Sequence, residues 1–376
     1  MNVSILQGRP IVLAAGGTGG HVYPALALAD VLRSRGWPIA FVTDERGTAF
    51  GDPSPGTEIY HIKAASLGGS ACSKLKGLTQ LGVGLLQARA LLKRLNPAAA
   101  IGFGGYPSVP TMCAATQIGT PTLIHEQNAV LGRANRLLAP RVRTIATSFE
   151  KISRIQPQAV SKTVLTGNPV RAAISTIGEM PYPSLAGTNP IHILIFGGSQ
   201  GARVLSDVVP TALTSLSQDE RSRLHVTQQC RPEDLERVKA AYESADIAAS
   251  LATYFDDMPE RLSEAHLVIA RAGASTISEL MASGRPAILI PYPHATDDHQ
   301  TANANNIAAA GAGWCIPEPS FTVEFVTGEF RRFIDQPDIL SETAANTKTL
   351  RRADAAARLA NAVEESVRLS QQGEAA

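Results

Sequence analysis

The sequence predicts an α/β protein of two doubly wound domains that face each other across a cleft. The chain has 376 residues, a length that usually forms two domains. Short apolar runs alternate with segments of helical periodicity, and several runs lack the period-two alternation of half-exposed strands. The two halves also open alike, each with a strand-like run, a glycine-rich turn and a helix-compatible segment: IVLAAGGTGGH at 11–21 and IHILIFGGSQG at 191–201.

Ten apolar runs are the candidate strands. In the first half they are 11–15, 38–43, 98–103, 121–125 and 142–147, and in the second half 191–196, 224–229, 266–270, 286–291 and 313–316. Four prolines and weak periodicity mark 167–190 as a linker between an N-terminal domain at 1–166 and a C-terminal domain at 191–340. The Ala-rich segment 341–376 carries Leu350, Leu359, Val363 and Val367 at helical spacing, which predicts a closing helix that crosses back to the N-terminal domain.

Composition favours a soluble globular protein. Hydrophobic residues make up 44% of the chain and charged residues 18%, and the formal net charge is +1, which argues against a protein that coats nucleic acid. The apolar run near the N-terminus is too short for a signal-peptide core, and the uncharged stretch 95–124 contains four prolines, so we expect no export signal and no membrane span. The four cysteines lie too far apart for a zinc or CxxC motif, which favours thiols in a reducing compartment.

The near-neutral total conceals a division of charge. Residues 1–170 contain 17 Lys and Arg against 7 Asp and Glu, a net charge of +10, whereas residues 171–376 contain 17 against 26, a net charge of −9. This asymmetry predicts an N-terminal domain that meets an anionic partner, although a chance distribution of surface charge is the alternative.

A helix expected over about 75–95 offers a candidate membrane surface. At 100° per residue one face is assigned to the core and carries Leu78, Leu81, Leu85, Ala88, Leu92 and Leu95. The opposite face carries a second apolar stripe with basic neighbours, namely Leu75, Val83, Leu86 and Ala90 beside Lys76, Arg89, Lys93 and Arg94. An apolar stripe bordered by cations suits an anionic membrane surface, and a helix buried on both sides is the alternative.

Both glycine-rich turns are candidate phosphate sites, because a strand that leads through glycines into a helix directs backbone N–H groups at one point. Neither matches a standard motif: Val22 stands where the dinucleotide fingerprint GxGxxG needs its third glycine, and no GK[ST] follows either turn. A third candidate is ARAGASTISEL at 270–280, where Ser275 or Thr276 opens a helix and Glu279 follows one turn later. An ordinary capping box is the competing interpretation of this third segment.

Eight ordered motifs resemble those of the MurG family of bacterial glycosyltransferases, over about residues 11–360. They are GGTGGHVYPALALA (16–29), GFGGYPS (102–108), HEQNAVLGRAN (125–135), TGNPVR (166–171), GGSQGAR (197–203), FDDM (255–258), RAGASTISEL (271–280) and PYPHATDDHQTANA (291–304). The resemblance implies the GT-B architecture of two Rossmann-like domains. It also implies inverting transfer of N-acetylglucosamine (GlcNAc) from UDP-GlcNAc to lipid I, giving lipid II for peptidoglycan synthesis at the cytoplasmic face of the plasma membrane, with no cofactor.

The resemblance carries a set of substrate-binding residues onto this sequence. They are Thr18, Gly19, Gly20, Asn128, Arg171, Ser199, Phe255, Ser275, Thr276, Glu279 and Gln300. It implies that Ser199, Thr276 and their loops hold phosphate, that Arg171 supplies positive charge, that the Phe255 backbone reads uracil and that Glu279 takes the ribose. Asn128 and Gln300 would contact the sugar. Because HATDDHQ contains an extra residue relative to the family pattern, His299 and Gln300 are alternatives for this second contact. No Asp-x-Asp sequence is present to hold a divalent metal, so we expect no metal site.

Inverting transfer needs a base that takes the proton of the acceptor hydroxyl. His21 follows the first glycine turn and has a suitable intrinsic pKa, so it is the candidate base. His125 and Glu126 form the competing pair, and a structural histidine that caps the turn is the bland alternative. We expect His21→Ala to lower turnover far more than donor affinity.

Three other functions fit parts of the pattern. A UDP-GlcNAc 2-epimerase would share the fold and the donor, and would need acid/base carboxylates around the sugar. A non-catalytic nucleotide-sugar-binding subunit is a second alternative, but it would not need polar motifs in both halves of the chain. An NAD-dependent dehydrogenase could use Asp44, but the failed glycine fingerprint counts against it.

Overall fold

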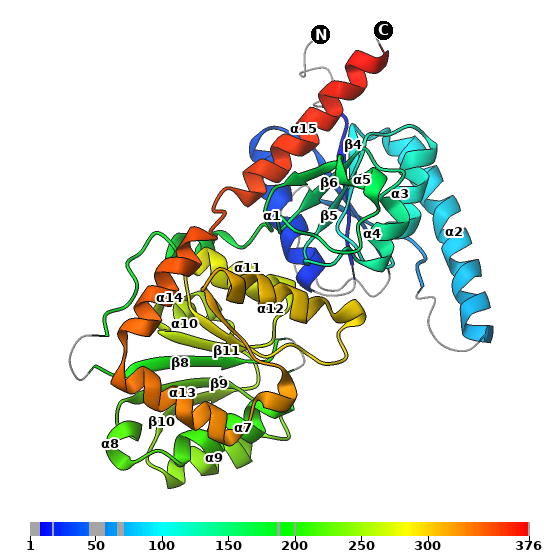
Figure 1. The fold of residues 1–376 in the computed structure, drawn as a ribbon. Coiled ribbons are helices and arrows are strands. Elements are labelled where there is room, and N and C mark those ends of the chain that lie inside the picture. The colour runs from blue at the N-terminus through cyan, green and yellow to red at the C-terminus, as the bar shows by residue number, and fades with distance from the viewer. Residues whose placement is uncertain are drawn as a thin grey trace. The chain divides into compact units, whose positions relative to one another are not determined.

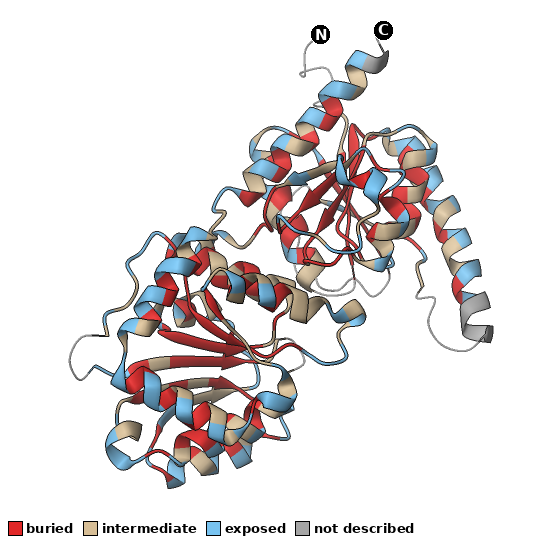
Figure 2. Ribbon diagram, in the orientation of Figure 1, coloured by how far each residue is buried: buried red, intermediate tan, exposed pale blue. Residues whose placement is uncertain are grey.

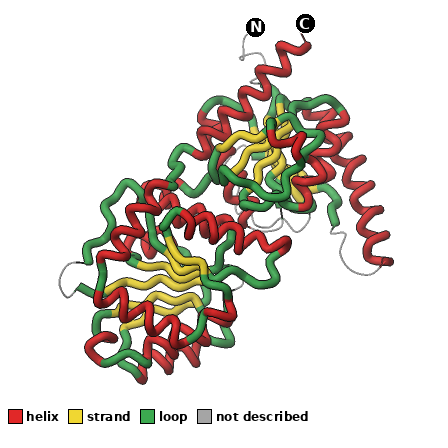
Figure 3. Tube along the Cα trace, in the orientation of Figure 1, coloured by secondary structure: helices red, strands yellow, loops and turns green. Residues whose placement is uncertain are grey.

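A computed structural model of the chain describes residues 8–16, 19–44, 57–65, 71–185, 189–198 and 201–374, without the side chains of 71–75, 373 and 374. The chain forms two compact units, and the first combines Met1–Arg171 with Asp354–Ala376 while the second is Ala172–Ala353 (Figure 1). Each unit is a parallel sheet with helices on both faces (Figure 3).

The first unit contains a seven-stranded parallel sheet in the order β3-β2-β1-β4-β5-β6-β7. Its strands are β1 (Ile11–Ala14), β2 (Ile39–Thr43), β3 (Glu58–His61), β4 (Ala99–Gly102), β5 (Thr122–Glu126), β6 (Thr144–Thr147) and β7 (Thr163–Leu165). Strand order reverses between β1 and β4, which pair from Ile11 with Ala99 to Ala14 with Gly102. Ligands of open α/β sheets bind at such a reversal, outside the carboxyl ends of the strands.

Helices cover both faces of this sheet (Figure 1). On one face lie α1 (Gly19–Ser34) and α15 (Ala355–Glu374), and on the other α2 (Ala71–Leu95), α3 (Ser108–Gln117) and α4 (Arg133–Leu138), while α5 (Pro157–Val160) links β6 to β7. Ile11 and Leu13 of β1 pack on the α1 side, and Val12 and Ala14 pack on the other. Because both faces are covered, successive residues of β1 are all buried, which explains its unbroken apolar sequence (Figure 2).

The second unit contains a six-stranded parallel sheet in the order β10-β9-β8-β11-β12-β13. Its strands are β8 (Ile191–Phe196), β9 (Leu224–Gln229), β10 (Ala248–Ala252), β11 (Leu267–Ala270), β12 (Ala287–Leu289) and β13 (Gly313–Cys315). Strand order reverses between β8 and β11, which pair from Leu267 with Ile193 to Ala270 with Phe196. The second sheet therefore repeats the arrangement of the first.

Helices also cover this second sheet. One face carries α7 (Arg203–Thr214), α9 (Leu235–Ser244) and α13 (Val323–Asp335), and the other α6 (Ala172–Ile177), α10 (Met258–Glu264), α11 (Ala274–Ser283) and α12 (His299–Ala309) (Figure 1). Helix α14 (Asp338–Thr349) packs on both α11 and α13. The remaining short elements are α8 (Gln218–Arg221) and the 3₁₀ helices η3 (Thr296–Asp298) and η4 (Glu318–Ser320).

The structure contains a strand at each of the ten expected places, and strands 191–196 and 224–229 have the expected bounds. Strands β3, β7 and β10 were not expected from the sequence. Each of them lies at the edge of its sheet and is largely half-buried or exposed, so none carries a continuous apolar run.

The expected linker and the expected C-terminal helix are not separate parts of the structure but are divided between the two units. Helix α6 and the residues up to 190 belong to the second unit, because α6 packs on α10 and α11 and Arg351 Nη2 donates to Ser175 O at 2.9 Å. The expected helix at the C-terminus is two helices: α14 belongs to the second unit, and α15 packs on α1 and β4 in the first. Leu359, Val363 and Val367 are buried there, while Leu350 lies between the two helices.

Candidate functional site

The first candidate site lies at the carboxyl edge of the first sheet, where the strand order reverses. His21 comes in the first turn of α1 after β1, Gly104 and Gly105 follow β4, and Gln127 follows β5. Since β1, β4 and β5 are neighbours in the sheet, the turns after them meet at one place. Thr18 of the first glycine turn lies outside the described residues.

His21 is half-buried and stands over the glycine turn that follows β4. A Cβ built on Gly104 would come 3.2 Å from His21 Cε1, and one on Gly105 would come 3.5 Å from Cδ2. Both glycines have positive φ, at 90° and 75°, so the turn needs glycine for its backbone conformation, and the His21 ring packs directly on it. His21 Nδ1 lies 3.3 Å from Gln127 Oε1. The ring is therefore held by its turn and by a neighbouring amide.

His125 is fully buried, and its pKa is lowered to about 4, chiefly by burial and further by the nearby His21. Its Nε2 lies 3.0 Å from Gly167 O, and its Nδ1 lies 3.0 Å from Gln127 Nε2. Both ring nitrogens are thus engaged inside the protein. This arrangement suits a structural neutral histidine and leaves no nitrogen for an acceptor hydroxyl.

Glu126 uses both carboxylate oxygens to hold the loop that follows β5. Oε1 accepts from the backbone N and the Nδ2 of Asn128, at 3.0 and 3.2 Å. Oε2 accepts from Gly132 N and Asn135 Nδ2, both at 2.8 Å. A buried carboxylate with four donors is a loop anchor, so the geometry favours His21 over Glu126 as the base.

Gly19 and Gly20 begin α1 beside the predicted cation. A Cβ on Gly19 would come 2.8 Å from Cε2 of Tyr23, so the Tyr23 ring occupies the place of a side chain there. The Arg171 guanidinium lies 5.5 Å from the centre of the Tyr23 ring. Gly19, Tyr23 and Arg171 therefore form one packed group at the start of α1.

The second candidate site lies at the equivalent edge of the second sheet. Gly197 N donates to Gln229 Oε1 at 3.2 Å, and Gln229 Nε2 donates to Thr253 O at 3.2 Å, so one side chain ties the ends of β8 and β10 together. A Cβ on Gly197 would come 2.3 Å from Ala202 N, which explains the need for glycine. Ser199 lies outside the described residues.

The N-cap of helix α11 is Gly273, which has no side chain. Among the described residues no side-chain hydrogen bond caps this helix, so the capping-box interpretation of Ser275 and Thr276 is wrong. Both residues are half-buried in the first turn, and Glu279 follows on the next turn. Open N–H groups after β11, at the strand-order reversal, suit an anionic ligand.

Gln300 joins the loops after β11 and β12. Its Oε1 accepts from Ala272 N at 3.2 Å and from Tyr292 N at 2.9 Å. Within the described part of the chain its amide nitrogen has no hydrogen-bond partner, so this N–H₂ group is the one available for a sugar. His299 Nδ1 donates to Thr296 O at 2.7 Å, which directs this ring nitrogen toward η3. The geometry favours Gln300 over His299 for the sugar contact.

Phe255 lies in the loop between β10 and α10, with its side chain buried. The Arg261 guanidinium lies 4.0 Å from its ring centre, and Asp257 holds Arg261 by a 2.7 Å hydrogen bond. Across the described residues, neither the backbone N–H nor the C=O of Phe255 takes part in a hydrogen bond. A base could therefore pair with this backbone, as the resemblance implies.

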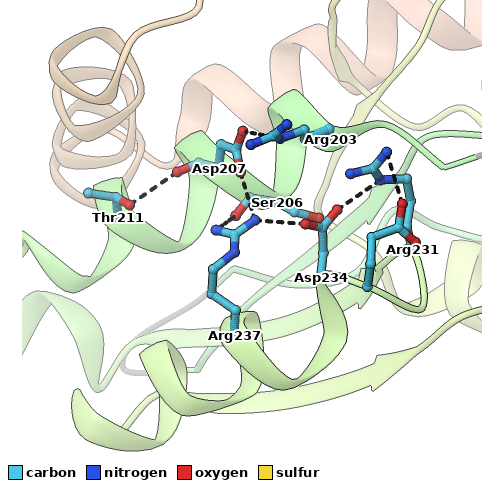
Figure 4. A network of polar contacts seen from close by, with 8 residues as sticks. Arg203, Ser206, Asp207, Thr211, Arg231, Asp234 and Arg237 are labelled. Carbon is cyan, nitrogen blue, oxygen red and sulfur yellow. Dashed lines mark hydrogen bonds and ion pairs between the residues drawn. The ribbon is translucent and has the colours of Figure 1, made fainter.

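An ion-pair network that the sequence analysis missed supports the glycine turn of the second unit (Figure 4). Asp234 is buried and accepts from Arg231 Nε at 2.8 Å and from Arg237 Nη2 at 2.9 Å, while Arg237 also pairs with Asp207 at 2.6 Å. Burial opposes ionisation of Asp234, but the two guanidinium groups outweigh it and lower the pKa. A Cβ on Gly201 would come 2.6 Å from Arg231 Cγ, so the network holds Arg231 against the turn. The Arg-x-x-Asp-x-x-Arg spacing at 231–237 was the available signal.

Helix α2 bears the predicted apolar stripe on its exposed side. Val83 is 42% exposed and Leu86 is 69% exposed, and Lys76 and Arg94 are exposed as well. The side chain of Leu75 lies outside the described residues. Leu78 was assigned to the core, but it is 56% exposed, because the contacts of α2 with the core cluster begin at Leu85. Gly84 faces inward, where a Cβ would overlap the Lys63 carbonyl oxygen.

Among the residues that the structure describes, no group of three or more His, Cys, Asp or Glu side chains is arranged to hold a metal ion. No helix in the described part of the chain combines the length and the apolar character needed to cross a bilayer.

Comparisons with known proteins agree with this architecture. The chain matches the glycosyltransferase family 28 N-terminal domain over residues 11–173 and the family's C-terminal domain over residues 192–359. The crystal structure of MurG from Acinetobacter baumannii superposes with a TM-score of 0.77 at 30% identity, covering 95% of this chain and 99% of that one. The two family matches, together with the two doubly wound units, identify a glycosyltransferase of the GT-B type.

Curated relatives narrow the family assignment further. It is 52% identical to the UDP-N-acetylglucosamine--N-acetylmuramyl-(pentapeptide) pyrophosphoryl-undecaprenol N-acetylglucosamine transferase of Paramagnetospirillum magneticum, over 94% of this chain and 95% of the relative. The enzyme of the same name from Rhodospirillum centenum is 49% identical, over 94% and 93%. The chain belongs to the MurG family within glycosyltransferase family 28. A UDP-GlcNAc 2-epimerase from Neisseria meningitidis shares the fold, with a TM-score of 0.65 at 12% identity.

Proposed function

We propose that the protein is an inverting glycosyltransferase that moves GlcNAc from UDP-GlcNAc to the 4-hydroxyl of N-acetylmuramic acid in lipid I, forming lipid II for peptidoglycan synthesis. Near full-length identity of about one half to transferases with this printed activity supports the substrates. The observation that carries the chemistry is the half-buried His21, held over the Gly104–Gly105 turn at the strand-order reversal of the first sheet.

In the proposed reaction His21 takes the proton of the acceptor hydroxyl as its oxygen attacks the anomeric carbon. The bond from that carbon to the diphosphate breaks, UDP leaves with the electron pair, and the configuration at the carbon inverts. His21 suits this task because its intrinsic pKa lies near neutrality and its ring is already positioned. Glu126 and His125 do not compete for the role, since their polar atoms are engaged with the protein.

We assign donor binding mainly to the second unit. The turn at 197–201, with Ser199, and the open first turn of α11, with Ser275 and Thr276, would hold the diphosphate by N–H and O–H groups. Glu279 would accept from the ribose hydroxyls, the Phe255 backbone would pair with uracil, and Gln300 would donate to the sugar. These local groups are needed because this half of the chain carries a net negative charge.

We assign further contacts to the first unit. Gly19, Gly20 and Thr18 would lie near the reacting groups beside His21, Asn128 would address the sugar and Arg171 would offset the charge of the departing diphosphate. The packing of Arg171 on Tyr23, and of Tyr23 on Gly19, supports a common location for these residues.

We also propose that the first unit rests on the cytoplasmic face of the plasma membrane, where the lipid acceptor lies. Val83 and Leu86 would enter the interface, with Lys76 and Arg94 beside anionic headgroups. The excess of positive charge in this half of the chain supports the same orientation.

The test is an assay of purified protein with UDP-GlcNAc and a soluble lipid I analogue, in which UDP release and the linkage of the product are measured. We expect UDP release that depends on the acceptor, a β-linked disaccharide product and no loss of rate with EDTA. Release without acceptor or a strict metal requirement would contradict the mechanism. Formation of UDP-N-acetylmannosamine from the donor alone would favour an epimerase.

A further inference from the structure

Four polar groups at the carboxyl edge of the first sheet form a continuous chain of hydrogen bonds. It runs from Gly167 O to His125, from His125 to Gln127 and from Gln127 to His21, with distances of 3.0, 3.0 and 3.3 Å. Gln127 and His125 are buried, with exposed fractions of 2% and 0%. The chain therefore leads from a backbone carbonyl in the interior to the half-buried ring of His21.

A backbone carbonyl fixes the proton at one end of this chain. Gly167 O can only accept, so His125 Nε2 carries a hydrogen and donates to it. The neutral state of His125, which its lowered pKa favours, then leaves Nδ1 as an acceptor. The atom that donates to Nδ1 is Gln127 Nε2.

Another backbone carbonyl fixes the orientation of the glutamine amide independently. Gln127 Nε2 lies 2.9 Å from Phe103 O and 3.3 Å from His125 O, and an amide oxygen in its place would face two acceptors. The amide therefore directs its NH₂ group inward and its carbonyl oxygen toward His21. Because Gln127 Oε1 can only accept, His21 Nδ1 carries the hydrogen between them.

We infer that Gln127 is a positioning residue that sets the tautomer of His21, so that the ring holds its proton on Nδ1 and presents the lone pair of Nε2 as the base. A histidine that is a base through one nitrogen needs its proton on the other, and a neighbouring acceptor selects that form. The inference rests on the proposed function for its kinetic part, while the tautomer itself belongs to the protein at rest.

The first test is nuclear magnetic resonance of the full chain with ¹⁵N-labelled histidine, in which two-bond correlations distinguish protonated from bare ring nitrogens. At neutral pH we expect His21 to carry hydrogen on Nδ1 and His125 on Nε2, with the signals assigned from His21→Ala and His125→Gln. A His21 ring protonated on Nε2 in the unsubstituted protein would overturn the inference, whatever reaction the protein catalyses.

The second test is a double-mutant cycle on transferase activity. Gln127→Met keeps the length of the side chain and removes the acceptor, so we expect kcat to fall about tenfold or more, up to the 10²–10⁴-fold contribution of a general base, with KM for UDP-GlcNAc little changed. In a His21→Ala background the same substitution should change kcat less than about threefold, because residues that act as a unit are not additive. Equal losses in both backgrounds would reduce Gln127 to a packing role and overturn the inference.

Gln228→Met is the matched control. Gln228 is fully buried in the second unit, where its Oε1 accepts from the Tyr242 hydroxyl at 2.6 Å. We expect this variant to lose stability while it keeps the His21 tautomer and the kcat of the unsubstituted protein. If Gln127→Met fails to fold, the tautomer of His21 in the unsubstituted protein still decides the inference. Absence of transfer by that protein would instead contradict the proposed function.

Discussion

The guanidinium of Arg171 lies 5.5 Å from the centre of the Tyr23 ring, two residues beyond His21 in α1. This packing holds the charge of Arg171, the last residue of the first unit, against the first turns of α1. A planar guanidinium suits both stacking on an aromatic ring and bidentate contact with phosphate, whereas a lysine ammonium provides only charge.

Arg171→Ala is therefore expected to raise KM for UDP-GlcNAc about tenfold or more, because a charged hydrogen bond contributes about 1.5–3 kcal/mol. Arg171→Lys should recover only part of this loss, and Tyr23→Leu should change KM in the same direction. Initial-rate kinetics measure all three variants. Arg358→Ala is the control, since Arg358 is exposed and pairs with Asp354, which immediately precedes α15. Full recovery by lysine would mean that charge alone matters.

Removal of the proposed base should separate turnover from binding. We expect His21→Ala to lower kcat about 10²–10⁴-fold while the Kd of UDP-GlcNAc changes only a few-fold, because the base acts only as the acceptor oxygen attacks. Single-turnover rates and calorimetric titration with the donor give the two quantities. A variant that turns over at nearly the normal rate would rule out His21 as the base.

Glu126→Gln should behave as a loop mutation. The amide places an NH₂ group against donors that the carboxylate now accepts from, so we expect the free energy of unfolding to fall by about 1–3 kcal/mol. KM should rise as the loop that carries Asn128 loosens. Denaturant unfolding and kinetics on the same preparation check both effects. An unchanged stability with a kcat lowered a hundredfold would instead support Glu126 as the base.

Membrane binding should depend on the exposed side chains of α2. Leu86→Glu adds a negative charge and removes apolar surface at a position that is 69% exposed, so we expect vesicle binding to fall about tenfold or more at unchanged stability. Flotation with anionic liposomes at low and high salt measures this. Leu137→Glu on α4 is the matched control, because Leu137 is 51% exposed and lies on another helix. Equal loss in both variants, or binding indifferent to anionic lipid, would contradict the proposed surface.

Stability should fall as the pH drops below 6.5. Burial lowers the pKa of His125 in the first unit and of His266 in the second to about 4, from 6.5, and the charge of His192 adds to the effect at His266. Each unfolded histidine binds a proton that its folded form excludes, so the stability is fully present above pH 6.5 and is lost progressively toward pH 4. Between pH 7.5 and pH 5 the loss is about 2 kcal/mol for each group.

Urea unfolding at several pH values measures this dependence. His266→Asn keeps an acceptor for His192 N, which now donates to His266 Nδ1 at 2.9 Å, and removes the titration. This variant should reduce the pH dependence of the second unit's transition and leave that of the first. An unaltered slope in the second unit would show that His266 does not titrate as described.

The sequence predicted the strands whose burial on both faces leaves a run of apolar residues. Strand β8 occupies the expected residues because five of the six residues of IHILIF are apolar and buried, as in a strand covered on both faces. The edge strand β10 was missed because half of its environment is solvent, which leaves no apolar pattern to detect. Periodicity separated the buried from the exposed face of α2 at Ala88 and Leu92, but it could not show that the core ends before Leu78, which was wrongly placed there.

The sequence by itself determined the family, the two doubly wound units and the glycine turns, because all of these follow from motifs and from the spacing of apolar residues. Only the tertiary structure decided that Glu126 anchors a loop, that Gly273 and neither Ser275 nor Thr276 caps α11, and that Gln127 lies against His21. His21 and Gln127 are separated by 106 positions along the chain. The order of strands in the sheet brings them together, and hydrogen bonds to two backbone carbonyls then fix which atoms face each other.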